Sequence, residues 1–178
     1  MNTESSNESN SNALVAKESH WLNDTWSVYF HNPFDNNWDE SGYIKLFSLA
    51  NIEEFWMMNT LLKPHTNEGM FFIMREHIFP KWNDDENKHG GFLSIKILKG
   101  KGPSFFEKIS INLVNETLLK PEHYHLTGNI NGISISPKKH FCIIKVWLKN
   151  FQLDSGNFFN ISKEYHGSIM FKTNTCVG

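Results

Sequence analysis

Arginine is almost absent from this sequence, cysteine is rare, and long apolar runs are missing. The single arginine, Arg75, and a formal net charge of -2 exclude the strongly basic composition typical of general polyanion-binding proteins. The two cysteines, Cys142 and Cys176, stand in no Cys-x-x-Cys or metal-binding spacing, so we expect reduced thiols and a cytosolic setting. No run is long enough to span a membrane and the N-terminus does not resemble a signal peptide, so no membrane association is expected.

The chain of 178 residues has the length of one domain that can bury a core. Residues 1–19 are polar and repetitive, and they carry too few apolar side chains to order themselves, so they predict a flexible tail. Residues 20–178 contain neither an internal repeat nor a second linker-like segment. We therefore expect a single domain over 20–178.

The hydrophobic pattern predicts an α+β fold. Helices are expected over 51–62, where Asn51 can cap the first turn, and over 103–118. The alternating pattern in 141–149 places Cys142 and its apolar neighbours on one face, and Lys145 and Trp147 on the other. We expect a curved antiparallel sheet that is backed by helices on its convex face and leaves its concave face open for a ligand. The other expected strands are 26–30, 43–49, 70–76 and 92–98, with further strands in the last third.

Aromatic residues are plentiful, with six Trp and fifteen Phe. Trp38 and Trp82 lie in expected loops and Trp147 on the open sheet face, positions that helices and core strands do not explain. Flat indole rings of this kind can sandwich a flat ligand such as a nucleobase, with about 1–3 kcal/mol for each stacked base. Any one of them can instead cover a local apolar cluster. Lysines near the site could meet phosphates attached to the base; the candidates are Lys138, Lys139, Lys145 and, less directly placed, Lys172.

Four segments resemble eukaryotic translation initiation factor 4E, the mRNA cap-binding family. The most specific is PKWNDDENKHGG (80–91), followed by HWLNDTWSVYF (20–30), NIEEFW (51–56) and KVW (145–147), in the family's order and at nearly its spacing. The resemblance implies that Trp38 and Trp82 sandwich 7-methylguanine, that Trp147 packs against its methyl group and that lysines hold the triphosphate. It also implies a monomeric, cytoplasmic, non-enzymatic protein whose ligand is capped mRNA, without a cofactor, a metal or catalytic residues.

One position departs from the family where the base would be read. The family has a guanine-reading Glu after its second stacking Trp, and this chain has Asn83. A carboxylate accepts both donors of the guanine edge, whereas an amide has one acceptor oxygen. Losing such a bidentate contact costs roughly 1–3 kcal/mol of discrimination. Either Asp84 or Asp85 takes over, or guanine is read more weakly, or the preferred base is a different or a deprotonated one.

The family's dorsal surface binds a partner helix of the type Tyr-x-x-x-x-Leu-φ, where φ is apolar. Glu107 and Lys108 replace the Leu and Glu that the family has there, so binding of the usual scaffold is in question. The resemblance assigns six residues to this surface: His20, Trp21, Ile52, Trp56, Ile111 and Val114.

Three other functions stay open at this point. The protein could be a cap-binding competitor that represses translation without recruiting the usual scaffold, or a binder of a non-standard cap. It could be an enzyme, if His123 and His125 shared the face of a strand and bound a metal, although no third ligand with zinc-like spacing is evident. Loss of the cap function with retention of the fold is disfavoured, because all three cleft Trp are kept.

Overall fold

The structure is a computed structural model that describes residues 19–174. Most of the tail expected over 1–19, and Cys176, therefore lie outside the described residues. Short 3-10 helices occupy many of the connections between the main elements. The strands are β1 (Trp21–His31), β2 (Tyr43–Asn51), β3 (Met70–Arg75), β4 (Gly91–Leu98), β5 (Ile130–Pro137), β6 (Phe141–Leu148) and β7 (Ile169–Thr173), and the helices are α1 (Ile52–Leu62) and α2 (Gly102–Val114).

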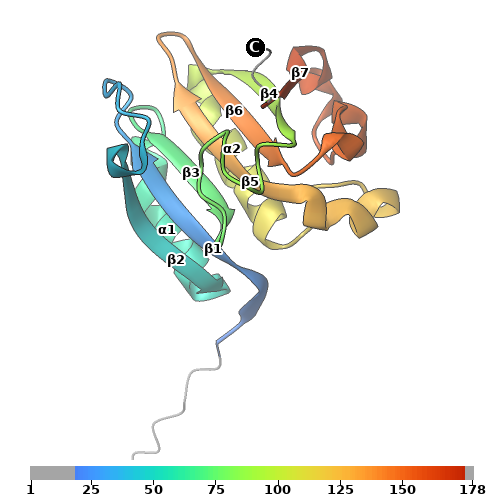
Figure 1. Ribbon diagram of the computed structural model, residues 1–178, viewed down its shortest axis with the longest axis horizontal. Helices are drawn as coiled ribbons and strands as arrows, with labels where there is room; N and C mark the ends of the chain where they lie inside the picture. Colours follow the sequence, from blue (N-terminus) through green and yellow to red (C-terminus); the bar gives the residue numbers. More distant parts are fainter. Residues whose placement is uncertain (1–18, 175–178) are drawn as a thin grey trace, which may run out of the picture.

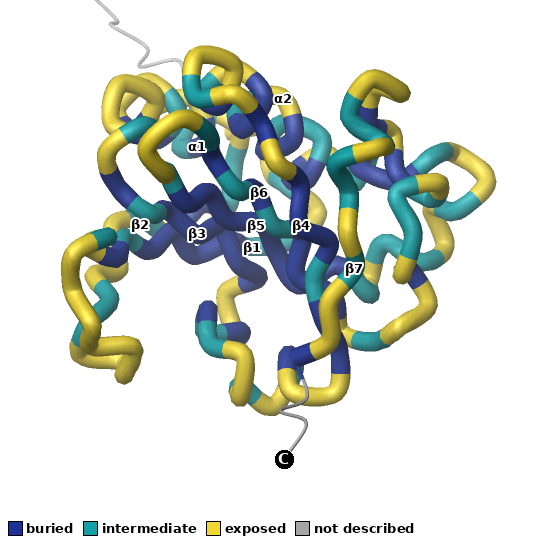
Figure 2. The backbone as a smooth tube through the Cα atoms, turned by 90° about the horizontal axis from the view of Figure 1, so that it is seen from above, coloured by how far each residue is buried: buried dark blue, intermediate teal, exposed yellow. Residues whose placement is uncertain are grey.

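The seven strands form one sheet in the order β2-β1-β3-β5-β6-β4-β7, with every neighbouring pair antiparallel (Figure 1). Both helices cover the same face of the sheet, while loops extend beyond the other face (Figure 2). Within residues 19–174, no helix is both long and apolar enough to cross a membrane. The predicted α+β class, a curved antiparallel sheet backed by helices, is confirmed.

Strand alternation divides the side chains between the core and the open face. On β6, Cys142, Ile144 and Val146 are fully buried under the helices, as the sequence predicts. Lys145 and Trp147 project to the opposite face of the same strand, where they line a cavity. The two-residue period of β6 therefore directs one set of its side chains into the core and the other set into the cavity.

Helix α1 begins as its sequence predicts. The Asn51 side chain accepts a hydrogen bond from the Glu54 backbone N–H, at 2.9 Å, and so satisfies one free donor of the first turn. The Glu54 carboxylate accepts in return from the Ala50 N–H, one residue before the cap. Phe55 and Met58 of this helix are buried in the core.

One expected helix is shorter than predicted. Helix α2 ends at Val114 rather than at residue 118, because Glu116 adopts a left-handed φ of 57° that the helix cannot continue. Residues 121–129, which hold His123 and His125, form a 3-10 helix, whereas the metal-binding alternative would need a strand there. Near the end of the described chain, short 3-10 turns span 156–158 and 163–168.

Candidate functional site

A cavity of about 790 Å³ opens on the sheet face opposite the helices. Its wall is rich in aromatic and cationic side chains, and no Asp or Glu of the described chain lines it. This composition suits a ligand that combines a flat ring with negative charge. The aromatic residues of the wall are Trp38, Tyr43, Phe72, Trp82, Phe92 and Trp147, and its lysines are Lys81, Lys138, Lys145 and Lys172.

Two of the three predicted tryptophans present half-exposed rings to this cavity. Trp38, in the loop between β1 and β2, is 49% exposed, and Trp82, in the loop between β3 and β4, is 52% exposed. Loops carry both rings, so each indole has a free surface on which a flat ligand can stack. The two residues are far apart in sequence, and the sheet brings both to one cavity.

Trp147 lines the cavity but is not an exposed residue, which corrects the sequence-based expectation of an open position. Only 5% of it is accessible, because it packs between Phe72 of β3 and Phe92 of β4. Its indole N–H donates a hydrogen bond to the Ser134 hydroxyl, at 3.0 Å. Trp147 therefore forms part of the cavity floor with a fixed orientation.

A buried amide holds the loop that carries Trp82. Asn87 is fully buried, and its Nδ2 donates to the carbonyls of Phe79 and Lys81, at 3.0 and 2.8 Å. Its Oδ1 accepts from Nδ2 of Asn131, at 2.9 Å. Sequence reasoning missed this role, because an Asn in a polar loop looks like any other loop residue and its partner Asn131 is distant in the sequence.

The two glycines that end this loop are required by close packing. A Cβ on Gly90 would collide with the carbonyl oxygen of Leu148, and one on Gly91 with that of Lys172. Side chains are therefore excluded where the loop enters β4. These contacts give a physical reason for the pair of glycines that closes the motif at 80–91.

Asn83 is exposed and is not one of the cavity-lining residues. The acids that follow it are engaged elsewhere. Asp84 accepts hydrogen bonds from the N–H groups of Phe79 and Glu86, and so it braces the loop. Asp85 pairs with Lys88 at 2.7 Å, and this hydrogen bond lowers the pKa of its carboxyl group.

The positive charge of the cavity comes from three of the four candidate lysines and from one further lysine. Lys138, Lys145 and Lys172 of β7 line the cavity, Lys139 does not, and Lys81 joins the wall. Burial lowers the pKa of Lys145, and the charges of Lys172 and Lys138 lower it further. The Lys145 ammonium lies 4.1 Å from the centre of the Phe92 ring. An anion that enters among these lysines would relieve their mutual repulsion.

The single arginine supports the fold rather than the cavity. Arg75 is buried, and its Nε and Nη2 donate to the carbonyls of Ile130 and Thr127, at 2.8 and 3.2 Å. Its Nη1 forms an ion pair with Asp24, and its guanidinium lies over the Trp26 ring. Lysines are consequently the only cations of the cavity wall among the described residues.

On the helical face, most of the predicted partner-binding residues are accessible. Trp21 is 73% exposed, Trp56 of α1 is 47% exposed, and the exposed His20 ring is hydrogen bonded to Glu53 at 2.8 Å. Ile52 is exposed and Ile111 partly so. Val114 does not belong to this surface, because it is buried in the core.

Glu107, one of the departures on this face, is tied to neighbouring side chains. Its carboxylate accepts from Lys63 at 2.6 Å and from Asn59 at 2.8 Å, and both hydrogen bonds lower its pKa. The charge that replaces an apolar family residue is thus paired within the protein. A partner helix would meet a neutralised pair at this point rather than an isolated carboxylate.

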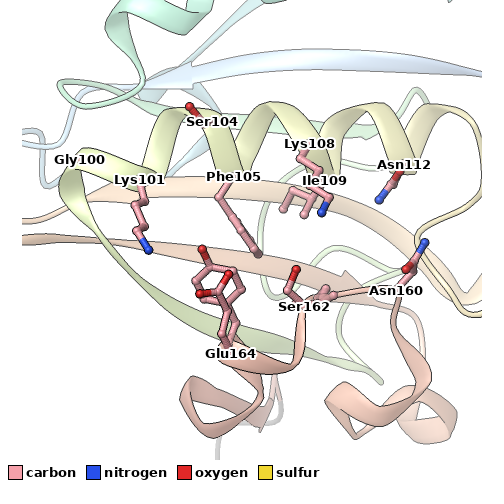
Figure 3. Close-up of a pocket in the computed structure, with 12 residues that line it drawn as sticks. Gly100, Lys101, Ser104, Phe105, Lys108, Ile109, Asn112, Asn160, Ser162 and Glu164 are labelled. Carbon is pink, nitrogen blue, oxygen red and sulfur yellow. The ribbon is translucent and has the colours of Figure 1, made fainter.

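A second hollow of about 330 Å³ lies between α2 and the segment 160–165 (Figure 3). Tyr165 is one of its lining residues. Phe105, Ile109, Lys101 and Glu164 line it too (Figure 3). None of the predicted cap-binding or partner-binding residues lines it. Over the described residues, no group of three His, Cys, Asp or Glu side chains is placed to hold a metal ion.

The sequence matches the family model described as "Eukaryotic initiation factor 4E" over residues 21–177. The chain belongs to the eukaryotic initiation factor 4E family. Initiation factor 4E-1 of Prunus domestica is 21% identical over 165 residues, which are 87% of this chain and 67% of the relative. Initiation factor 4E of Candida glabrata is 24% identical over 139 residues, 74% of this chain and 64% of the relative. The chain thus spans about two thirds of the length of these relatives.

Solved structures of the same family share the fold. A complex of C. elegans eIF4E-3 with the 4E-binding protein Mextli and a cap analog superposes with a TM-score of 0.67 at 16% identity, covering 77% of this chain and 78% of that one. Ascaris suum eIF4E-3 with an m7G cap gives a TM-score of 0.65 at 14% identity, covering 77% of each chain. At these identities the likeness establishes a common architecture.

Proposed function

We propose that this protein binds the 7-methylguanosine 5′ cap of mRNA and supports translation initiation. One observation carries the proposal: two half-exposed tryptophans, Trp38 and Trp82, share a cavity with three mutually repelling lysines, and no Asp or Glu among residues 19–174 lines it. Family membership, and relatives solved with cap ligands, support the same ligand. Nothing in the comparisons favours the alternative of a competitor or repressor.

The chemistry of a cap matches the two parts of this cavity. Each base–aromatic stack contributes about 1–3 kcal/mol, and the positive charge of the methylated ring adds a cation–π term of up to about 2 kcal/mol when it is desolvated. The triphosphate would lie against Lys138, Lys145 and Lys172, in place of the predicted set with Lys139. We assign Trp147 the role of a fixed apolar wall for the base.

Base reading rests on Asn83 in this proposal. Asp84 and Asp85 cannot replace the missing carboxylate without giving up the loop hydrogen bonds and the ion pair described above. An amide offers one acceptor to the two guanine donors. We therefore expect weaker discrimination for guanine than a carboxylate would give, by about 5- to 150-fold.

The partner proposal concerns the helical face. C. elegans eIF4E-3 has been solved with the 4E-binding protein Mextli, which supports a regulator or scaffold helix as the partner class. We propose that such a helix contacts Trp56, Ile52 and Ile111, with Trp21 and His20 beside it. We further propose a cytoplasmic, monomeric protein that acts by binding rather than by catalysis and needs no cofactor.

The proposal is tested by calorimetric titration with 7-methyl-GTP, GTP and ATP. We expect 7-methyl-GTP to bind best, Trp82→Leu to abolish most of this binding, and Asn83→Glu to raise the preference for guanine. Trp21→Leu is the matched control, because it removes an exposed tryptophan that does not line the cavity. Equal binding of all three nucleotides by the native protein and by Asn83→Glu would refute cap recognition.

A further inference from the structure

A histidine lies directly beneath one of the stacking tryptophans. His31, the last residue of β1, is fully buried, and its ring is parallel to the Trp38 indole, with 4.1 Å between the ring centres and 8° between the planes. Trp38 nevertheless remains half exposed and lines the cavity. One face of the indole is thus supported from inside the protein, while the ring still offers free surface to a ligand.

The same imidazole is hydrogen bonded to the loop that carries Trp38. Its Nε2 is 2.9 Å from the carbonyl oxygen of Asn37, the residue before Trp38, and because a carbonyl only accepts, Nε2 carries the proton. The Asn37 side chain in turn accepts from the Asp39 N–H and donates to the Ser41 hydroxyl. The ring and backbone contacts of His31 therefore fix both the plane and the position of the Trp38 indole.

The second nitrogen of this ring is unused. Nδ1 of His31 is buried without a hydrogen-bond partner among the described residues. Tyr43 faces the imidazole with its ring edge, at 4.9 Å, and burial raises the pKa of Tyr43 to about 12, so that group is neutral at ordinary pH. Asp39, the residue after Trp38, pairs with Lys81 at 3.8 Å and not with His31.

We propose that His31 is a positioning residue for the cap base, because its flat ring holds the Trp38 ring in its stacking orientation. The proposal rests on the proposed cap-binding function. Loss of the flat ring should reduce the stacking of a base on Trp38.

The experiment compares His31→Phe and His31→Ala with the native protein by calorimetric titration of 7-methyl-GTP and GTP at one fixed pH. Phenylalanine keeps a flat ring under Trp38 without the hydrogen-bonding nitrogen, and alanine removes the ring. His65→Ala, which removes an exposed histidine outside the cavity, is the control. The triphosphate is common to both nucleotides, so the ratio of their affinities at one pH isolates the base.

We expect His31→Ala to weaken 7-methyl-GTP binding about 2- to 10-fold, the value of one aromatic pair, and His31→Phe to restore it. Native affinity in His31→Ala, or no recovery of affinity in His31→Phe, would overturn the inference while leaving cap binding intact. Absence of 7-methyl-GTP binding by the native protein would overturn both. If His31→Ala does not fold, His31→Leu, which fills the space without a flat ring, takes its place in the comparison.

Discussion

Replacing Asn87 by Asp should release the loop that presents Trp82. The exchange is nearly isosteric and turns the donating Nδ2 into an acceptor that faces the carbonyls of Phe79 and Lys81, at 3.0 and 2.8 Å. Leaving a buried carbonyl without its donor costs about 1–3 kcal/mol. Two such losses amount to about 4 kcal/mol. The hydrogen bond from Asn131 to Oδ1 can persist in the variant, so it adds nothing to this cost.

This cost falls on a surface loop, so part of it can be avoided by local opening rather than global unfolding. We expect the free energy of unfolding in urea to fall by up to about 4 kcal/mol. We also expect faster amide hydrogen exchange over residues 79–89 and a loss of 7-methyl-GTP affinity of at least about tenfold, because the open loop no longer holds Trp82 over the cavity.

Asn83→Asp is the matched control for stability. It makes the same chemical change four residues away in the same loop, at an exposed side chain that makes no hydrogen bond to any residue of 19–174. We expect it to alter the free energy of unfolding by less than about 0.5 kcal/mol. If Asn87→Asp is no less stable than Asn83→Asp and exchanges no faster, the buried amide does not hold the loop and the reasoning fails.

Three further predictions concern other parts of the protein. A bound phosphate should raise the lowered pKa of Lys145, so binding of 7-methyl-GTP should be accompanied by proton uptake. Calorimetry in buffers of different ionisation enthalpy measures this uptake, and the affinity should fall as alkaline pH deprotonates Lys145 in the free protein. Equal proton uptake by Lys145→Met would contradict this prediction. Arg75→Lys should lower the free energy of unfolding, measured in urea, by about 2–3 kcal/mol, because one ammonium cannot reproduce the guanidinium hydrogen bonds. An unchanged midpoint of urea unfolding would show that these hydrogen bonds do not stabilise the fold. Trp56→Ala should weaken the binding of a Tyr-x-x-x-x-Leu-φ peptide by about 2 kcal/mol or more and leave cap binding unchanged. The control Met57→Ala should bind the peptide with native affinity. An equal loss of peptide binding in both variants would argue against a specific hot spot at Trp56.

Local patterns in the sequence determined the framework of this protein. The alternation along 141–149 was sufficient to predict which residues enter the core and that Lys145 and Trp147 face the other side, because strand geometry repeats every two residues. Asn51 and Glu54 were sufficient to predict the start of α1, because a helix cap is completed within a few residues. The loop motif at 80–91 indicated the family, which the family model bears out.

The tertiary structure alone decided how the site is built, because its contacts join segments that are distant in the chain. Trp147 is buried since β3 and β4 bring Phe72 and Phe92 against it, and Lys172 enters the cavity because β7 pairs with the edge of β4. His31 supports Trp38 only once the loop folds back over the end of β1. Periodicity and capping depend on near neighbours, whereas burial and the partners of a buried polar group depend on register between strands, which no short segment of sequence contains.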